Sequence, residues 1–236
     1  APLFYGWLVS TWVIGMIWGD WAYSWKDVLL NVFFGFNFVP GQAEGIVWIS
    51  WPIGLEVAFY VLFPFIFRVF NTLGRAIGLL LFTLLLDLGF KYLTVSVLHT
   101  PGDFYVHSLF HFLPAFAVGM ITFFIYRDYI EGKSLPRGWG YGLMAASVVA
   151  YLTWSSQVYL PLLNETAQEE LRVALKTAHI HYYGILWQAL AYGALVLGLA
   201  IAPARALVNR VSEFFGEISY SVYLNHPRVI LAFAFV

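Results

Sequence analysis

The chain has 236 residues, of which 61% are hydrophobic and only 11% are charged. Ordinary soluble domains are roughly 45–50% apolar and about 25% charged, so this composition excludes a soluble globular protein and indicates an integral membrane protein. The formal net charge of -1 provides no basic surface for nucleic acid, and the absence of cysteine excludes disulfides, thiolate metal sites and cysteine nucleophiles.

Long apolar segments follow one another along the whole chain. A transmembrane helix needs roughly 20 mostly apolar residues, and we find about seven such segments. In chain order they are residues 3–18, 46–67, 76–98, 106–126, 139–163, 180–202 and 214–236. The apolar run 29–38 is too short to cross a membrane and ends before a Pro-Gly turn signal, which predicts an interfacial or re-entrant segment. We therefore predict an all-α, polytopic transmembrane helix bundle that forms a single domain over residues 1–236.

Lysine and arginine gather in every second loop between these segments. The loop "HTPGDFY" has no Lys or Arg, and in "NETAQEELRVALKTAH" the acidic residues outnumber the basic ones. The positive-inside bias places the cation-rich loops and the amino end in the cytoplasm, and the remaining loops outside. The cations that define the cytoplasmic loops are Arg68, Arg75, Arg127, Lys133, Arg137, Arg205 and Arg210.

Three ionisable residues lie deep inside the predicted segments. Counted from the segment ends at 1.5 Å per residue, Glu56, Asp87 and His226 are each about 15–18 Å deep, close to the midplane. A charge at this depth costs at least a few kcal/mol, and such residues usually face a protein interior or a water-filled path. They are therefore the first candidates for functional residues.

Each of these residues also has a structural alternative. Asp87 and Lys91 are four residues apart on one predicted helix and can form an ion pair, and Glu56 can simply hydrogen-bond a neighbouring helix. His226 precedes Pro227, which frees a backbone carbonyl one turn earlier, so the imidazole can repair a kinked helix.

A metal site is not predicted. His107 and His111 are spaced to share one helix face, which is a spacing that can hold a metal ion. No acidic third ligand is near them in the sequence, so the pair alone does not indicate a metal centre.

A carboxylate and a histidine at one depth allow two kinds of chemistry. Histidine is the usual general base near neutral pH, and a carboxylate can orient it for acyl transfer to a hydroxyl. The same groups can carry protons, and a proton-coupled transporter or flippase using Glu56, Asp87 and His226 is the alternative. No internal duplication typical of such transporters is present, and a purely structural scaffold leaves the three groups unexplained.

Three stretches resemble signatures of the membrane acyltransferase 3 family. "SWPIGLEVAFYVLFPFIF" (residues 50–67) resembles the family's Trp-Ser-Ile-Gly-Val-Glu-x-x-Phe-Tyr-Leu-Leu-Phe-Pro signature. "FLPAFAVGMITF" (112–123) is similar to its Leu-Pro-x-Phe-x-x-Gly segment, and "FFGEISYSVYLNHPRVI" (214–230) to its closing Leu-Gly-x-Ser-Tyr-Ser-x-Tyr-Leu-x-His helix. The residues of the first stretch that fall on the family pattern are Trp51, Gly54, Glu56, Phe59, Tyr60, Phe63 and Pro64.

The resemblance implies a membrane O-acyltransferase of the plasma (inner) membrane. It implies transfer of an acyl group, most often acetyl, from acyl-CoA to a hydroxyl of an extracytoplasmic or envelope glycan. The implied partners are the acyl-CoA donor, a glycan or lipid-linked sugar acceptor and membrane lipid, with no bound cofactor, no metal and no nucleic acid. By resemblance the catalytic residues are Glu56 and His226, and the substrate-binding residues are Trp51, Tyr60, Tyr220 and Tyr223.

The chain also departs from the family pattern. The family's catalytic histidine and its Arg-x-x-Arg motif, both in amino-terminal helices, have no counterpart here, and His111 stands where the family often has arginine. We therefore expect these 236 residues to be an excerpt cut at both ends that lacks the principal base, with weak or no activity by itself.

Overall fold

The computed structural model describes residues 2–18, 23–47, 50–159 and 184–234, and these residues form helices and connecting loops without a β-strand. Two compact units are present. The first unit comprises Ala1–Val69, Leu85–His111 and Val208–Val236, and the second comprises Phe70–Leu84 and Phe112–Leu207. The all-α prediction is confirmed, whereas the single domain stays a prediction.

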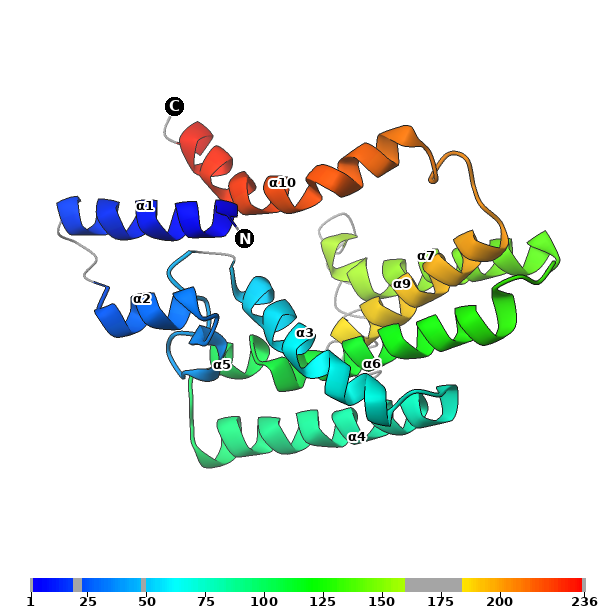
Figure 1. Ribbon diagram of the computed structural model, residues 1–236, viewed down its shortest axis with the longest axis horizontal. Coiled ribbons are helices and arrows are strands. Elements are labelled where there is room, and N and C mark those ends of the chain that lie inside the picture. The colour runs from blue at the N-terminus through cyan, green and yellow to red at the C-terminus, as the bar shows by residue number, and fades with distance from the viewer. Residues whose placement is uncertain (1, 19–22, 48–49, 160–183, 235–236) are drawn as a thin grey trace, which may run out of the picture. The chain divides into compact units, whose positions relative to one another are not determined.

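Each predicted apolar segment contains a helix (Figure 1). The helices are α1 (Pro2–Trp18), α2 (Trp25–Val32), the 3-10 turn η1 (Phe36–Phe38), α3 (Trp51–Val69), α4 (Leu73–Lys91) with the π-helical turn η2 (Tyr92–Val97), α5 (Gly102–Val106), α6 (Leu109–Ile125) with the π-helical turn η3 (Tyr126–Ile130), α7 (Arg137–Tyr159), α9 (Gly184–Ile201) and α10 (Arg210–Ala234).

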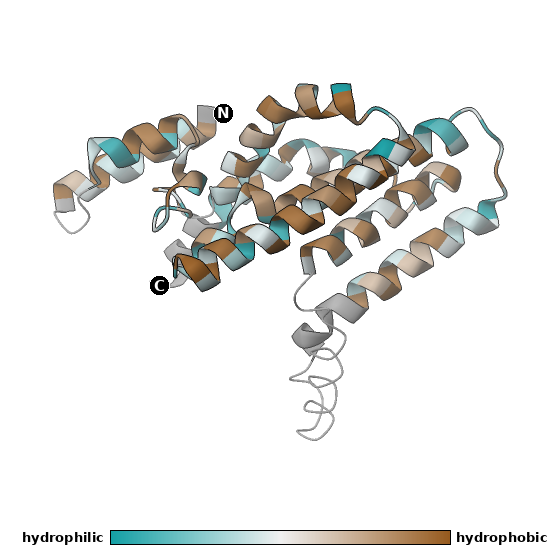
Figure 2. Cartoon of the chain, turned by 90° about the horizontal axis from the view of Figure 1, so that it is seen from below, coloured by the Kyte–Doolittle hydropathy of each residue, from teal (hydrophilic) through white to brown (hydrophobic). Residues whose placement is uncertain are grey.

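Four stretches of the described chain are long and apolar enough to cross a membrane: Trp51–Val69, Leu73–Val97, Gly102–Ile130 and Gly184–Ile201. A shorter apolar helix covers Leu3–Ile17. Apolar residues run along the surfaces of these helices, while polar residues gather at their ends and in the loops (Figure 2). A membrane protein is thus supported, but the count of about seven spans is not confirmed.

Two predicted boundaries move in the structure. Helix α3 begins at Trp51 rather than at residue 46, because Ile46 and Val47 belong to a buried loop that follows a turn at Gly45 with φ of 75°. Glu56 therefore lies about 7.5 Å from the start of its helix, at 1.5 Å per residue. Helix α10 begins at Arg210, which places His226 about 24 Å from its start.

The first unit is built around one apolar cluster. Residues of α1, of the buried loop before α3, of α3 itself and of α10 meet there, and partly buried side chains of α2 pack against them. Burial of this apolar area stabilises the unit at about 25 cal/mol per Å². The cluster consists of Phe4, Leu8, Ile46, Val47, Ile53 and Leu224.

The second unit packs helices closely through small residues. A Cβ atom at Gly140 of α7 would lie 2.8 Å from the carbonyl oxygen of Gly198 in α9, and a Cβ at Gly198 would lie equally close to the carbonyl oxygen of Gly140. Such glycine contacts let helix backbones approach each other, as is common between transmembrane helices.

Candidate functional site

Helices α3 and α10 bring Glu56, Tyr220 and Tyr223 together in the first unit. The Glu56 carboxylate lies close enough to both phenol groups to interact with them electrostatically. Val57, next to Glu56, and Tyr223 pack against the same apolar cluster, which holds the two helices in this register. The carboxylate can accept a proton, and the two nearby phenol hydroxyls can donate hydrogen bonds to a developing oxyanion.

His226 makes the helix-repairing contact that its position before Pro227 predicts. Its Nδ1 atom lies 2.7 Å from the carbonyl oxygen of Tyr223, which has no helical donor because Pro227, four residues later, lacks an N–H. Since a carbonyl only accepts, Nδ1 carries the proton and donates it. The neutral ring then has its lone pair on Nε2, the form that can accept a proton.

Trp51 and Tyr60 both belong to α3, the helix that carries Glu56. The Trp51 ring stacks against His107 with centroids 4.5 Å apart, at the start of α3. Tyr60, one turn after Glu56, is 65% exposed, and its ring centroid lies 6.5 Å from that of Phe59. Residues four apart are neighbours on a helix surface, so Tyr60 shares a face of α3 with Glu56, whereas Trp51 lies one and a half turns before it.

Asp87 interacts electrostatically with Lys91, as the sequence spacing predicts, but its hydrogen bonds are made with other residues. The Tyr105 hydroxyl donates to Asp87 Oδ1 at 2.8 Å, and His111 Nδ1 lies 3.1 Å from the same oxygen. Lys91, the partner predicted from sequence spacing, has its Nζ 5.8 Å from the centre of the Tyr105 ring. Asp87 is only 3% exposed, so these two hydrogen bonds satisfy a buried carboxylate whose desolvation is otherwise costly.

The two histidines with metal-like spacing are used differently. His111 binds Asp87, whereas His107 caps the short helix α5 and stacks on Trp51. Within the described residues, no group of three or more His, Cys, Asp or Glu side chains is arranged to hold a metal ion.

Asn37 is a buried polar residue that sequence reasoning missed. Its Nδ2 atom lies 3.2 Å from the carbonyl of Ala43, 3.3 Å from that of Trp51 and 3.2 Å from that of His107. It thereby ties the loop before α3, the start of α3 and the end of α5 together. A Cβ atom at Gly54 would overlap Asn37 Oδ1, so the glycine of the α3 motif makes room for this amide.

Comparison with known proteins gives one match. A family model described as an acyltransferase domain matches residues 1–236, the whole chain. No curated protein and no solved structure is similar enough to match.

Proposed function

The chain belongs to the acyltransferase 3 family, and from this premise we propose that it takes part in O-acylation at a membrane. The donor is acyl-CoA, most often acetyl-CoA, reached from the cytoplasm. The acceptor is a hydroxyl of an extracytoplasmic or envelope glycan, free or lipid-linked, and the membrane is the plasma (inner) membrane.

The observation that carries this proposal is the approach of Glu56 to Tyr220 and Tyr223. These residues come from two motifs that resemble the family's own, at opposite ends of the chain. Their proximity is expected if the two motifs form one site. A packing role alone would not need an ionisable group among apolar neighbours, where its charge costs a few kcal/mol.

The reaction joins the acceptor oxygen to the acyl carbon and breaks the thioester C–S bond. Glu56 orients or accepts the proton of the acceptor hydroxyl, and Nε2 of His226 is a second proton acceptor. The proton finally reaches the departing sulfur, so the products are an ester and the free thiol. The hydroxyls of Tyr220 and Tyr223 donate to the oxyanion that forms at the carbonyl, a contribution worth about 10²–10³ in rate for one donor in other acyl-transfer enzymes. Trp51 and Tyr60 bind substrate outside this centre.

The test is transfer of radiolabelled acetyl from acetyl-CoA to glycan in membranes that contain the whole gene product. His226→Asn keeps a side-chain donor for the Tyr223 carbonyl but removes the basic nitrogen. If His226 handles a proton, this variant loses activity together with His226→Ala. If His226→Asn keeps activity while His226→Ala loses it, the only role of His226 is to donate a hydrogen bond to the Tyr223 carbonyl.

The matched control is Glu217→Gln, an exposed position of α10 in the same unit. It should label glycan at the wild-type rate at equal protein levels. Absence of labelling above background by the wild-type protein, with several acyl-CoA donors, would contradict the proposed function itself.

A further inference from the structure

The first unit contains a polar pocket of about 360 Å³. Its walls come from Tyr23 and α2, from residues 41–46, and from Asp103 at the start of α5. These segments belong to two loops that the positive-inside bias places outside the membrane. Their meeting at one pocket agrees with that orientation, in which the pocket opens on the side proposed for the acceptor.

The pocket walls are held in place by hydrogen bonds. Asn31 accepts a hydrogen bond from the Ile46 N–H and donates one to the Asp27 carbonyl, both at 2.9 Å. Asp27 also forms a capping box with Ser24 at the start of α2. A site with walls fixed in this way loses little freedom when a ligand binds.

Gln42 presents a polar atom without a partner. Its Nε2 donates to Asp27 Oδ1, whereas its Oε1 is buried and has no hydrogen-bond partner among the residues that the structure describes. A buried acceptor without a donor costs free energy. Because this oxygen has no accessible surface, a ligand in the pocket cannot reach it, and the contribution of Gln42 to the site is its hydrogen bond to Asp27, which fixes residues 41–46 to α2.

Tyr23 adds a hydroxyl and a flat ring. Burial, together with the neighbouring Asp27 carboxylate, raises the pKa of the Tyr23 phenol, so the hydroxyl stays protonated at neutral pH and can donate. The ring provides an apolar face beside polar groups. This combination of aromatic surface with a few convergent hydrogen-bonding groups is typical of small-ligand sites.

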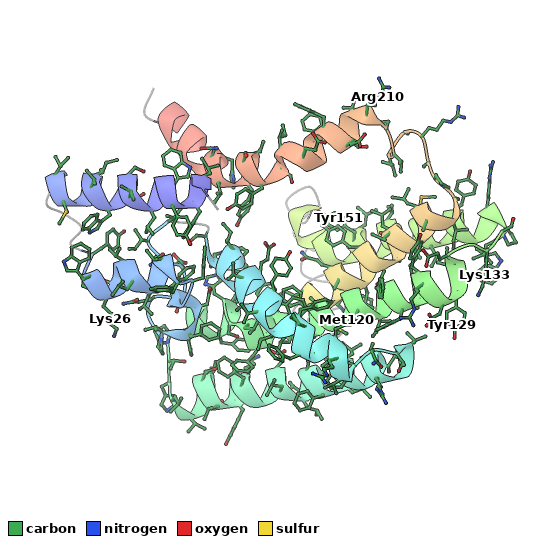
Figure 3. All side chains as sticks on the ribbon, viewed as in Figure 1. Lys26, Met120, Tyr129, Lys133, Tyr151 and Arg210 are labelled. Carbon is green, nitrogen blue, oxygen red and sulfur yellow. The ribbon has the colours of Figure 1, made fainter. Side chains whose placement is uncertain are left out.

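Carboxylates line the pocket. Asp27, Glu44 and Asp103 are among its lining residues, and none of the described lining residues is a lysine or arginine. Hydrogen bonds from Ser24 lower the pKa of Asp27, which is therefore ionised at neutral pH. Lys26, labelled on α2 in Figure 3, interacts with Asp27 from outside the set of described lining residues. Three carboxylates among the described lining residues disfavour an anionic ligand, because like charges repel each other.

The pocket is connected to the beginning of α3. Glu44 and Asp103 interact electrostatically with His107, and His107 stacks on Trp51. Glu56 follows Trp51 by five residues, about 7.5 Å along the helix.

We propose that this pocket is the acceptor subsite of the acyltransferase and holds an uncharged or amino sugar unit while rejecting uronic and phosphorylated sugars. This inference rests on the proposed function, and it adds a location and a charge preference for the acceptor. A sugar unit of a polymer and one carried on a lipid have the same recognised chemistry.

Binding is tested without turnover, by saturation-transfer NMR on the whole protein in nanodiscs at neutral pH. The probes are methyl glucoside, methyl glucosaminide and methyl glucuronide. We expect signals from the first two and at least about tenfold weaker binding of the glucuronide. Tyr23→Phe, which removes the hydroxyl that can donate to the sugar, should weaken methyl glucoside binding about tenfold, and the double variant Glu44→Gln/Asp103→Asn should admit the glucuronide.

The control is Asp128→Asn, an exposed change in η3 of the second unit, which should bind all three probes like the wild type. Circular dichroism confirms that each variant is folded. Equal binding of the three probes, or unchanged binding by both pocket variants, overturns the inference. Glycoside binding without any acyl transfer overturns the proposed function instead. Separating lipid-soluble from polymeric labelled glycan then identifies the source of the acceptor.

Discussion

Replacing Gly54 with alanine tests how the start of α3 is positioned. In an ordinary helix this change stabilises by up to about 1 kcal/mol, because glycine is a poor helix former. Here the new Cβ would overlap Asn37 Oδ1 and would lie 3.0 Å from Cζ of Phe36. The buried Asn37 amide would have to move, and with it the three carbonyls that its Nδ2 approaches.

The magnitude follows from these contacts. An amide has two N–H groups, so about two hydrogen bonds are lost, each worth roughly 1 kcal/mol net. Overpacking adds about 1–3 kcal/mol, and the gain in helix propensity offsets up to about 1 kcal/mol. We expect Gly54→Ala to destabilise the protein by about 2–4 kcal/mol.

The assay is unfolding in mixed micelles, followed by circular dichroism. Gly89→Ala is the matched control, because a Cβ at this α4 position meets no atom within 4 Å, and it should be neutral or stabilising. In an Asn37→Ala background, the loss in unfolding free energy caused by Gly54→Ala should be smaller by at least about 1 kcal/mol, since the overlapping oxygen is gone. If Gly54→Ala is as stable as Gly89→Ala, the positioning argument is wrong.

Three further predictions concern packing, the buried carboxylate and pH. Gly198→Ala should destabilise the protein by about 1–3 kcal/mol in the same assay. Gly142→Ala on α7, where a Cβ meets open space, should leave the stability unchanged. Equal stability of the two variants would contradict close packing of α7 against α9. Tyr105→Phe removes a hydroxyl bound to buried Asp87 and should cost about 1.5–3 kcal/mol, so an unchanged unfolding curve would exclude this bond. Because hydrogen bonds lower the pKa of Asp27, its ionised form stabilises the α2 cap above about pH 4, and amide protection factors in α2, corrected for the intrinsic exchange rate, should fall as pH drops below that value. In Asp27→Asn this loss of protection should vanish, and its persistence would show that another group causes the pH effect.

Hydropathy predicted the helical segments well, but it misplaced the starts of α3 and α10. The apolar residues Ile46 and Val47 look like the beginning of a span, but they are buried in a loop against Phe4 and Leu8. A buried loop and a membrane helix contain the same residue types, so composition cannot separate them. The turn at Gly45, with its positive φ, is the local signal that places the helix start later.

The motifs name Glu56 and the two tyrosines of α10, and in the structure Glu56 interacts electrostatically with both of them; the roles assigned to these residues stay predictions. The hydrogen bond of His226 follows from Pro227. Asp87 was paired with Lys91 because spacing along one helix is visible in a sequence, and the two groups do interact. The hydrogen-bond partners of Asp87 are 18 and 24 residues away, and contacts at that separation depend on how helices pack.

The most direct measurement is labelled acetyl transfer to glycan in membranes that contain either the wild-type protein or Glu56→Gln at equal amounts. The amide keeps the size of the side chain but cannot accept a proton. If Glu56 belongs to an acyl-transfer site, the wild type labels glycan and the variant does so at least about a hundredfold more slowly, in the range typical for loss of a general acid–base group. Equal labelling by the two proteins would show that Glu56 takes no part in the reaction and would contradict the proposal that α3 and α10 form the acyl-transfer site.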